Sequence, residues 1–346
     1  MKKYLLLIVL AIQAVIVSAQ FKADKEPFIV RSLKGESIKM AEIQTSGGGI
    51  SVTGVNPEEA RLEIFVTPNN NKNDMTKEEI QARLDEMYTL EISITGNKLT
   101  AKAKSKQDIR DWKKALNISF HAYVPKNFST DLSTAGGGIH IQDISGNQEF
   151  STSGGGLDVS GVSGKINGRT SGGGIRLSDS KDEIELSTSG GSIHASNCDG
   201  KLRLSTSGGS LDLEDLKGEI RATTSGGSID GNKISGELIT HTSGGSIHLK
   251  GLTCSLETST SGGNIYVSMD ALGKYVKVSN SGGNIDLELP KSKGMDLDLS
   301  ANRIKTDHLD NFSGKMDDNN VEGKLNGGGI EVRASAGSGR IYLSLK

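Results

Sequence analysis

The sequence is dominated by a Ser/Ala-Gly-Gly motif that recurs every eighteen residues. Its regular copies begin at Ala135, Ser153, Ser171, Ser189, Ser207, Ser225, Ser243 and Ser261, and one more begins two residues late, at Ser281. A fixed period of this length is typical of a solenoid, in which each unit buries its apolar face only by stacking on copies of itself. The period therefore says more about the shape of the molecule than about what that shape binds.

Apolar and polar residues alternate within each unit. With Ser153 as position 1, position 5 is Ile or Leu in every copy from Ile139 to Ile285. Positions 7, 10 and 14 are mostly aliphatic, whereas positions 6 and 15 are mostly polar or charged. This alternation predicts short β-strands at positions 4–8 and 13–17, each with one buried face and one face in water.

The remaining positions carry residues typical of turns. Gly at positions 2 and 3 is expected to supply backbone with positive φ. Position 9 is mostly Asp, Asn or Gly, position 12 is mostly Gly, and Thr at position 18 is expected to stack beside the Gly-Gly corner. Two strands, a short third side and three corners make one coil of a parallel β-solenoid. A left-handed hexapeptide helix would need aliphatic residues at positions 11 and 17, which are polar here.

Both ends of the array depart from the repeat. An early copy of the motif, Thr45–Ile50, precedes the array by 89 residues, so most of residues 67–115 is expected to be an excursion from an N-terminal coil. Within the excursion, a capping box at Thr76–Glu79 predicts a helix, and Leu90–Thr95 with Lys98–Lys104 predicts a hairpin.

At the other end, the repeat decays after Ser300, with an insertion near Asn311–Asn320. It is expected to resume at Asn326–Ile330. Atypical terminal coils are usual in solenoids, because an open last coil would template aggregation.

These features together resemble a known family. The repeated Thr-Ser-Gly-Gly-X-Ile, the excursion after the first copy and the Val124-Pro125-Lys126 return are similar to the bacterial putative-adhesin family of β-strand repeat proteins, which is related to head GIN and toast-rack domains. The resemblance covers about Phe28 to the C-terminus. It implies a right-handed parallel β-helix in the bacterial envelope, and it offers no catalytic residues to transfer.

The chain begins with features of a secretory signal peptide. Lys2 and Lys3 precede an uncharged, mostly apolar run from Tyr4 to Val17, which is too short to span a bilayer. Small residues at the cleavage positions predict a cut between Ala19 and Gln20. No later run approaches spanning length, so we expect an exported protein without a transmembrane segment after cleavage, located in the periplasm or at the cell surface.

The predicted organisation is therefore all-β, a right-handed parallel β-helix of about 18 residues per coil with a small α/β excursion near the N-terminus. Residues 1–19 form the signal peptide, residues 20–134 the N-terminal coils with the excursion at about 67–115, and residues 135–346 the regular array with degenerate C-terminal coils. Forty-five glycines and only 4% aromatic residues fit such a scaffold better than an ordinary globular core.

The sequence contains no pattern typical of a site for a metal ion, a phosphate group or a nucleic acid. His140, His194 and His248 share one outward column, but neighbours are three coils, or roughly 14 Å, apart, too far for one zinc ion. A calcium-binding nonapeptide repeat would need a second Gly-Gly in each coil, and the glycines precede strands rather than the helix that phosphate binding requires. A net charge of −2 argues against nucleic acid as a partner.

An enzyme of the carbohydrate-cleaving β-helix type would need two clustered carboxylates. Outward carboxylates exist at Asp158, Asp212, Glu214 and Asp230, but no long loop walls a cleft between Ala135 and Asp270. The sequence therefore predicts no catalytic, cofactor-binding or metal-ligating residue, no cofactor and no enzymatic activity.

Three classes of function stay open at this point. The first is a structural or adhesin-like scaffold of the bacterial envelope. The second is an envelope sensing or regulatory module that contacts an unknown protein or glycan through the excursion, and the third is a carbohydrate-active enzyme.

The two cysteines, Cys198 and Cys254, are expected to be free thiols. They lie three coils apart, at roughly 14 Å, whereas a disulfide bridges at most about 7 Å between Cα atoms. Cys198 occupies the aliphatic position 10 and should be buried, and Cys254 occupies the corner position 12 and should be the more reactive.

Overall fold

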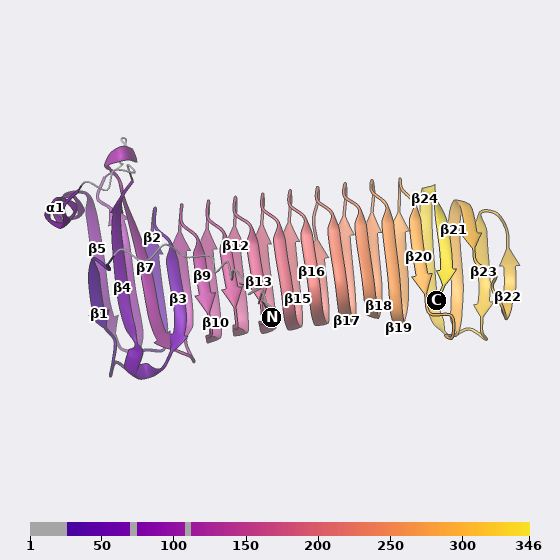
Figure 1. Cartoon of the computed structure of the whole chain (residues 1–346), viewed down its shortest axis with the longest axis horizontal. Coiled ribbons are helices and arrows are strands. Elements are labelled where there is room, and N and C mark those ends of the chain that lie inside the picture. Colours follow the sequence, from indigo (N-terminus) through magenta and orange to yellow (C-terminus); the bar gives the residue numbers. More distant parts are fainter. Residues whose placement is uncertain (1–25, 70–74, 108–111) are drawn as a thin grey trace, which may run out of the picture.

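The computed structural model describes residues 26–69, 75–107 and 112–346, so the predicted signal peptide lies outside the described part of the chain. The described residues form a long rod of stacked strands, with the helix α1 at one end and β22 at the other (Figure 1). None of the described helices is long and apolar enough to cross a membrane.

The elements of the N-terminal end are β1 (Ile29–Ser32), β2 (Met40–Thr45), β3 (Ile50–Val55), η1 (Pro57–Glu59), β4 (Arg61–Pro68), α1 (Lys77–Met87), β5 (Tyr88–Thr95), β6 (Lys98–Ser105), η2 (Trp112–Lys114) and β7 (Leu116–Pro125). The array comprises β8 (Ser129–Thr134), β9 (Ile139–Gln142), β10 (Ser145–Thr152), β11 (Leu157–Ser160), β12 (Ser163–Thr170), β13 (Ile175–Ser178), β14 (Lys181–Thr188), β15 (Ile193–Thr206), β16 (Leu211–Thr223), β17 (Ile229–Thr242), β18 (Ile247–Thr260) and β19 (Ile265–Asn280). The C-terminal end comprises β20 (Ile285–Leu289), β21 (Met295–Thr306), β22 (Phe312–Met316), β23 (Asn320–Leu325) and β24 (Ile330–Leu345).

From β8 to β18, the strand residues of the array pair in parallel with the residues eighteen positions further along the chain. Register shifts occur between β18 and β19. Leu157 of β11 lies opposite Ile175 of β13, and Ile175 lies opposite Ile193 of β15. In the coils from β9 to β14, each coil contains two separate strands. From β15 to β19, a single long strand continues through the corners of each coil. The prediction of a parallel β-solenoid with eighteen residues per coil is confirmed.

The aliphatic columns form the core of the rod. Position 5 is buried in every coil of the array, and positions 7, 10 and 14 are buried wherever they are aliphatic. Position 16 adds Phe150, Leu186 and Leu204 to the same core. Each buried Ile or Leu contributes on the order of 1.5–3 kcal/mol, so the narrow interior needs no large aromatic residues.

Threonine at position 18 closes the corner from inside. Thr170 Oγ1 donates a hydrogen bond to the carbonyl oxygen of Gly155, at 2.7 Å, and accepts one from the backbone nitrogen of Gly173, at 3.3 Å. The same pair of bonds recurs at Thr152, Thr188, Thr206, Thr224 and Thr242. Each hydroxyl therefore satisfies backbone groups that the corner would otherwise leave buried without partners.

The Gly-Gly corner needs glycine for a different reason from the one expected. Positive φ occurs at position 9, as in Asp143 and Asn197, and at position 12, as in Gly164, but not at the two corner glycines. A Cβ added to Gly173, at position 3, would instead lie 2.0 Å from the carbonyl oxygen of Gly155 in the coil below. The prediction of positive φ at positions 2 and 3 is wrong, and close stacking of backbones imposes glycine at position 3.

The N-terminal excursion is part of the sheet rather than a separate module. The predicted helix and its capping box are confirmed in α1, and the predicted hairpin is β5 and β6. However, β6 pairs in parallel with β2, and β7 pairs in parallel with β3. The early copy of the motif stacks directly against the array, since a Cβ on Gly137 would lie 2.1 Å from the carbonyl oxygen of Gly48.

The last strand in sequence, β24, is not the last in space. It pairs with β19 and β20 of one coil and also with β21, so it lies between them. Gly339 continues the stacked column, because an added Cβ would lie 1.9 Å from the carbonyl oxygen of Gly283. Parallel pairing resumes at Ile330, where β24 begins, in line with the predicted return of the repeat at Asn326–Ile330. The turn before it differs from the corners of the array, because Gly327, Gly328 and Gly329 all have positive φ.

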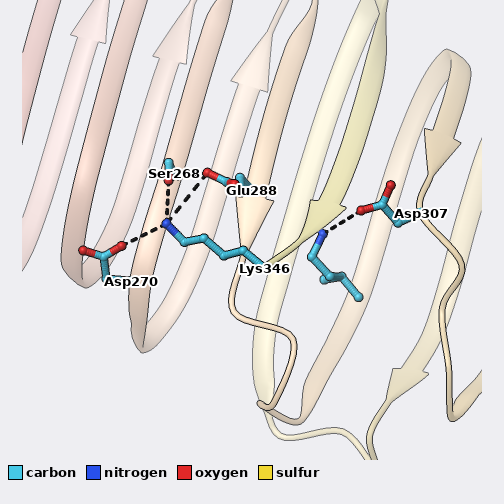
Figure 2. A network of polar contacts seen from close by, with 6 residues as sticks. Ser268, Asp270, Glu288, Asp307 and Lys346 are labelled. Atoms are coloured by element: carbon cyan, nitrogen blue, oxygen red, sulfur yellow. Dashed lines mark hydrogen bonds and ion pairs between the residues drawn. The ribbon is translucent and has the colours of Figure 1, made fainter.

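The C-terminal residue is fixed to the neighbouring coil by its side chain (Figure 2). Lys346 Nζ donates to Ser268 Oγ at 2.8 Å and to Asp270 Oδ1 at 2.9 Å, and it lies 3.7 Å from Glu288 Oε2. The hydrogen bond to Asp270 is the main cause of a raised pKa for Lys346. These contacts hold β24 against β19 and β20.

Both cysteines are free, as expected, but both are buried. Cys254 is 1% exposed because its backbone does not adopt the positive φ of Gly236, its neighbour in the coil below, and the next coil places Leu272 opposite it. Burial raises the pKa of Cys198 to about 11 and that of Cys254 to about 12. The burial of Cys254 therefore removes the reason for expecting it to be the more reactive thiol.

Candidate ligand groove

The outward side chains at position 6 form one continuous ladder along the rod. Each member pairs with the next through the register of its strand. In spatial order the ladder runs Glu63, His121, Ser51, His140, Asp158, Arg176, His194, Asp212, Asp230, His248, Tyr266, Asp286, Tyr342 and Lys305. Sequence order is broken at both ends of this ladder, so only the folded structure brings its terminal members into line.

A groove of about 840 Å³ follows the N-terminal part of this ladder. Its floor is the backbone of positions 4 and 5, with glycine at Gly49, Gly138, Gly156 and Gly174. Its wall is formed by the ladder residues His121, Ser51, His140, Asp158, Arg176 and His194. Six strands at about 4.8 Å spacing give the groove a length of roughly 24 Å.

Position 4 has no side chain in four coils of the groove, at Gly49, Gly138, Gly156 and Gly174, and this leaves the groove hollow. From the next coil onward the same position carries Ser192, Ser210, Ser228 and Ser246, followed by Asn264 and Asn284. Ser192 is the last position-4 residue that lines the groove. The change from Gly to Ser along one column thus marks where the groove ends.

Contacts between histidine and aspartate side chains along the ladder leave the Arg176 guanidinium without a partner among the described residues. His140 Nδ1 lies 3.7 Å from Asp158 Oδ2, and His194 Nδ1 lies 2.9 Å from Asp212 Oδ2. Arg176 stands between Asp158 and His194, is exposed, and forms no hydrogen bond or ion pair with any residue that the structure describes. An unpaired, exposed guanidinium can bind an anionic group by donating two parallel N–H···O hydrogen bonds to its oxygens.

The three histidines considered from the sequence do not meet. His140 and His194 both line the groove, but they lie three strands apart, with Asp158 and Arg176 on the two strands between them. His248 lies beyond it, stacked on Tyr266 with ring centroids 4.6 Å apart. The described ranges contain no group of three or more His, Cys, Asp and Glu side chains that could hold a metal ion.

The four outward carboxylates are also dispersed. Asp158 pairs with His140 inside the groove, whereas Asp212, Glu214 and Asp230 are exposed on the coils beyond it. Asp212 and Asp230 lie opposite each other on adjacent strands, outside the groove. The groove itself therefore presents one carboxylate, already paired, rather than an acid and a base facing a common substrate.

Comparison with known proteins identifies the repeat. Residues 175–344 match the family model described as Toastrack DUF4097. The match covers slightly less than half of the chain, and this segment is similar to the Toastrack family. The resemblance inferred from the motif is confirmed, and the Toastrack repeat supplies the strands that carry His194 and the rest of the ladder beyond it.

Two solved structures are similar to the chain. One is a putative cell adhesion protein from Clostridium sporogenes, with 9% identity, 92% of this chain and 98% of that chain covered, and a TM-score of 0.23. The other is a putative adhesin from Bacteroides fragilis, with 14% identity, 91% and 96% coverage, and a TM-score of 0.22. No curated protein matches the chain.

The groove was missed at the sequence level although its signal is present there. The first two glycines of the motif are the same in every copy of the array, whereas the third residue after Ser or Ala differs between copies. Copies at Ser46, Ala135, Ser153 and Ser171 read Gly-Gly-Gly, and the following four read Gly-Gly-Ser. That difference coincides with the extent of the groove.

Proposed function

We propose that this protein is an exported, non-catalytic β-solenoid that acts as an adhesin-like scaffold in the bacterial envelope. The observation that carries the proposal is the uninterrupted register from β9 to β18, in which every coil repeats the same outward columns. A rod of this kind holds many surface positions at fixed spacing, which suits contact with an extended or repeating partner. Export rests on the signal peptide predicted at residues 1–19.

Cell fractionation combined with surface labelling tests this proposal. Intact cells of the native host are treated with a membrane-impermeant amine reagent, and the protein is then recovered from periplasmic and outer fractions. Labelling of the protein on intact cells, together with adhesion of protein-coated beads to cells, is the expected result. Recovery from the cytoplasm with Met1 still present would overturn it.

A second candidate is a sensing module that contacts its partner through the N-terminal end. The helix α1 favours it, because Leu84 is its one buried residue and its other described side chains are partly or fully exposed. Retention in the periplasm and capture of one defined partner that is lost when the exposed residues of α1 are changed would favour this function over adhesion.

A further inference from the structure

The glycines on the groove floor are not required by the fold. A Cβ on Gly156 would lie 3.1 Å from the carbonyl oxygen of Gly174, and one on Gly174 would lie 3.2 Å from that of Ser192. These contacts are close, but the same backbone carries a Cβ at Ser192 and Ser210 further along the column. Glycine at position 4 therefore serves something other than stacking, and its visible effect is to open the groove.

We propose that the groove binds an extended acidic polysaccharide, with a carboxylate or sulfate group of the sugar chain paired to Arg176. This inference deepens the proposed function, because it names the surface and the class of ligand that an adhesin-like scaffold would use.

The exposed guanidinium of Arg176 in the groove wall favours an anionic ligand. The carboxylate of Asp158 is near His140, and that of Asp212 is bonded to His194, so Arg176 has no competing partner in the described chain. A carboxylate and a sulfate each offer two oxygens that match the guanidinium fork. The imidazoles and Ser51 add hydrogen-bonding groups that suit sugar hydroxyls on either side of that anchor.

The backbone of the groove disfavours a peptide as the ligand. A bound peptide commonly adds a strand to an open sheet edge and gains affinity from main-chain hydrogen bonds. Here the groove crosses the strands, and its backbone groups are already paired between coils, as in Ile139 N to Gly156 O and Leu157 N to Gly174 O, both at 3.0 Å. A ligand in this groove must bind through side chains and the glycine floor, which a chain of hydroxylated rings can do.

The length of the groove indicates an oligomer rather than a single sugar. Its wall extends over six strands, or roughly 24 Å.

Binding of fluorescein-labelled acidic oligosaccharides to the purified mature chain tests the proposal. The probes are an oligouronate and a sulfated dextran oligomer, and the comparison probes are neutral dextran and polyglutamate. Arg176→Gln is expected to weaken binding of an acidic oligosaccharide at least tenfold. The double variant Gly156→Ser with Gly174→Ser fills the floor and is expected to do the same without lowering the melting temperature.

Matched controls use equivalent residues outside the groove. Arg203→Gln removes an exposed cation at position 15, and Ser210→Gly alters position 4 in a coil beyond the groove; both are expected to bind as the wild type does. Preference for the uronate or for the sulfated probe decides which anionic group is read, and either supports the proposal.

Equal binding of polyglutamate, equal loss in Arg203→Gln, or no binding of either acidic probe would overturn the proposal. None of these outcomes bears on export or cell adhesion, so failure of the groove and failure of the scaffold function are distinguishable.

Discussion

Positions 3 and 4 of the coil are neighbouring glycines in the first half of the array, but the structure treats them differently. At position 3, the carbonyl oxygen of the coil below lies 2.0 Å from where a Cβ of Gly173 would be. At position 4, the corresponding contact of Gly174 is 3.2 Å, and later coils carry serine there. Glycine at position 3 is required for the coils to stack, whereas glycine at position 4 is not required for stacking and instead shapes the surface.

This difference shows how a repeat separates structure from function. Stacking applies to every coil equally, so it fixes the residues that never vary along the array, such as Gly at position 3 and Ile or Leu at position 5. A ligand touches only some coils, so its signature is a residue type that changes part-way along a column. The change from Gly174 to Ser192 is a signature of this kind.

The largest loss of stability is expected from placing a charged side chain at one buried position of the core. Ile193 is fully buried at position 5, so Ile193→Asp places an unpaired carboxylate in the core and should cost several kcal/mol of stability. His194→Asp, one residue later, loses an exposed contact with Asp212 and brings two like charges together, at a cost of about 1 kcal/mol or less. Thermal melting of the two variants checks this, and equal losses would refute the strand parity on which the comparison rests.

A smaller effect is expected on the alkylation rates of the two thiols, which test whether the corner at position 12 is closed to solvent. Because burial raises the pKa of Cys198 to about 11 and that of Cys254 to about 12, both should be largely un-ionised at pH 8 and react slowly with iodoacetamide. Cys254 should be the slower of the two. Mass spectrometry of the native protein over a time course measures both rates, and rapid labelling of Cys254 would show that its corner is open.

The same shifts give a pH dependence with a defined sign. A thiol whose pKa is higher in the folded chain contributes stability that is complete below its unfolded pKa and is lost as the pH rises towards the folded value. The free energy of unfolding should therefore fall between about pH 9 and pH 12. Replacing Cys198 by Val, the residue that another coil carries at position 10 as Val162, should remove part of that slope.

The array could be predicted from the sequence because every unit repeats the same evidence. The alternation around Ile193 gives strand parity, and Asp143 and Gly164 mark the corners at positions 9 and 12. The capping box at Thr76–Glu79 is equally local and predicts α1. Local signals of this kind depend on neighbouring residues only.

The ends could not be predicted in the same way. The residues of β24 alternate like those of any coil, and nothing within them indicates that they pair between β20 and β21 instead of following β21 outward. Likewise, the three glycines at Gly327–Gly329 resemble a stacked corner in sequence, but their positive φ distinguishes them in the structure. Spatial order at the ends depends on which edges remain open after the rest of the rod has formed.

The functional surface falls between these cases. Residues of the ladder such as His140 and His194 could be placed on one outward column from the sequence alone. The change from Gly to Ser at position 4 is also visible in the sequence, but the sequence does not show that it opens a groove. That conclusion depends on a distance, because it requires that a Cβ fit at position 4 as it does at Ser192. The contrast between 2.0 Å and 3.2 Å is a property of the stacked coils, not of the motif.

The most direct test of the account substitutes the same residue at two adjacent positions of one coil. Gly173→Ser places a Cβ against the backbone of Gly155 and should lower stability by about 3 kcal/mol or more, with a clear drop in melting temperature. Gly174→Ser reproduces what the next coil carries at Ser192 and should melt within about 0.5 kcal/mol of the wild type. Equal destabilisation by the two substitutions would contradict the claim that only the first glycine column is required by the stack.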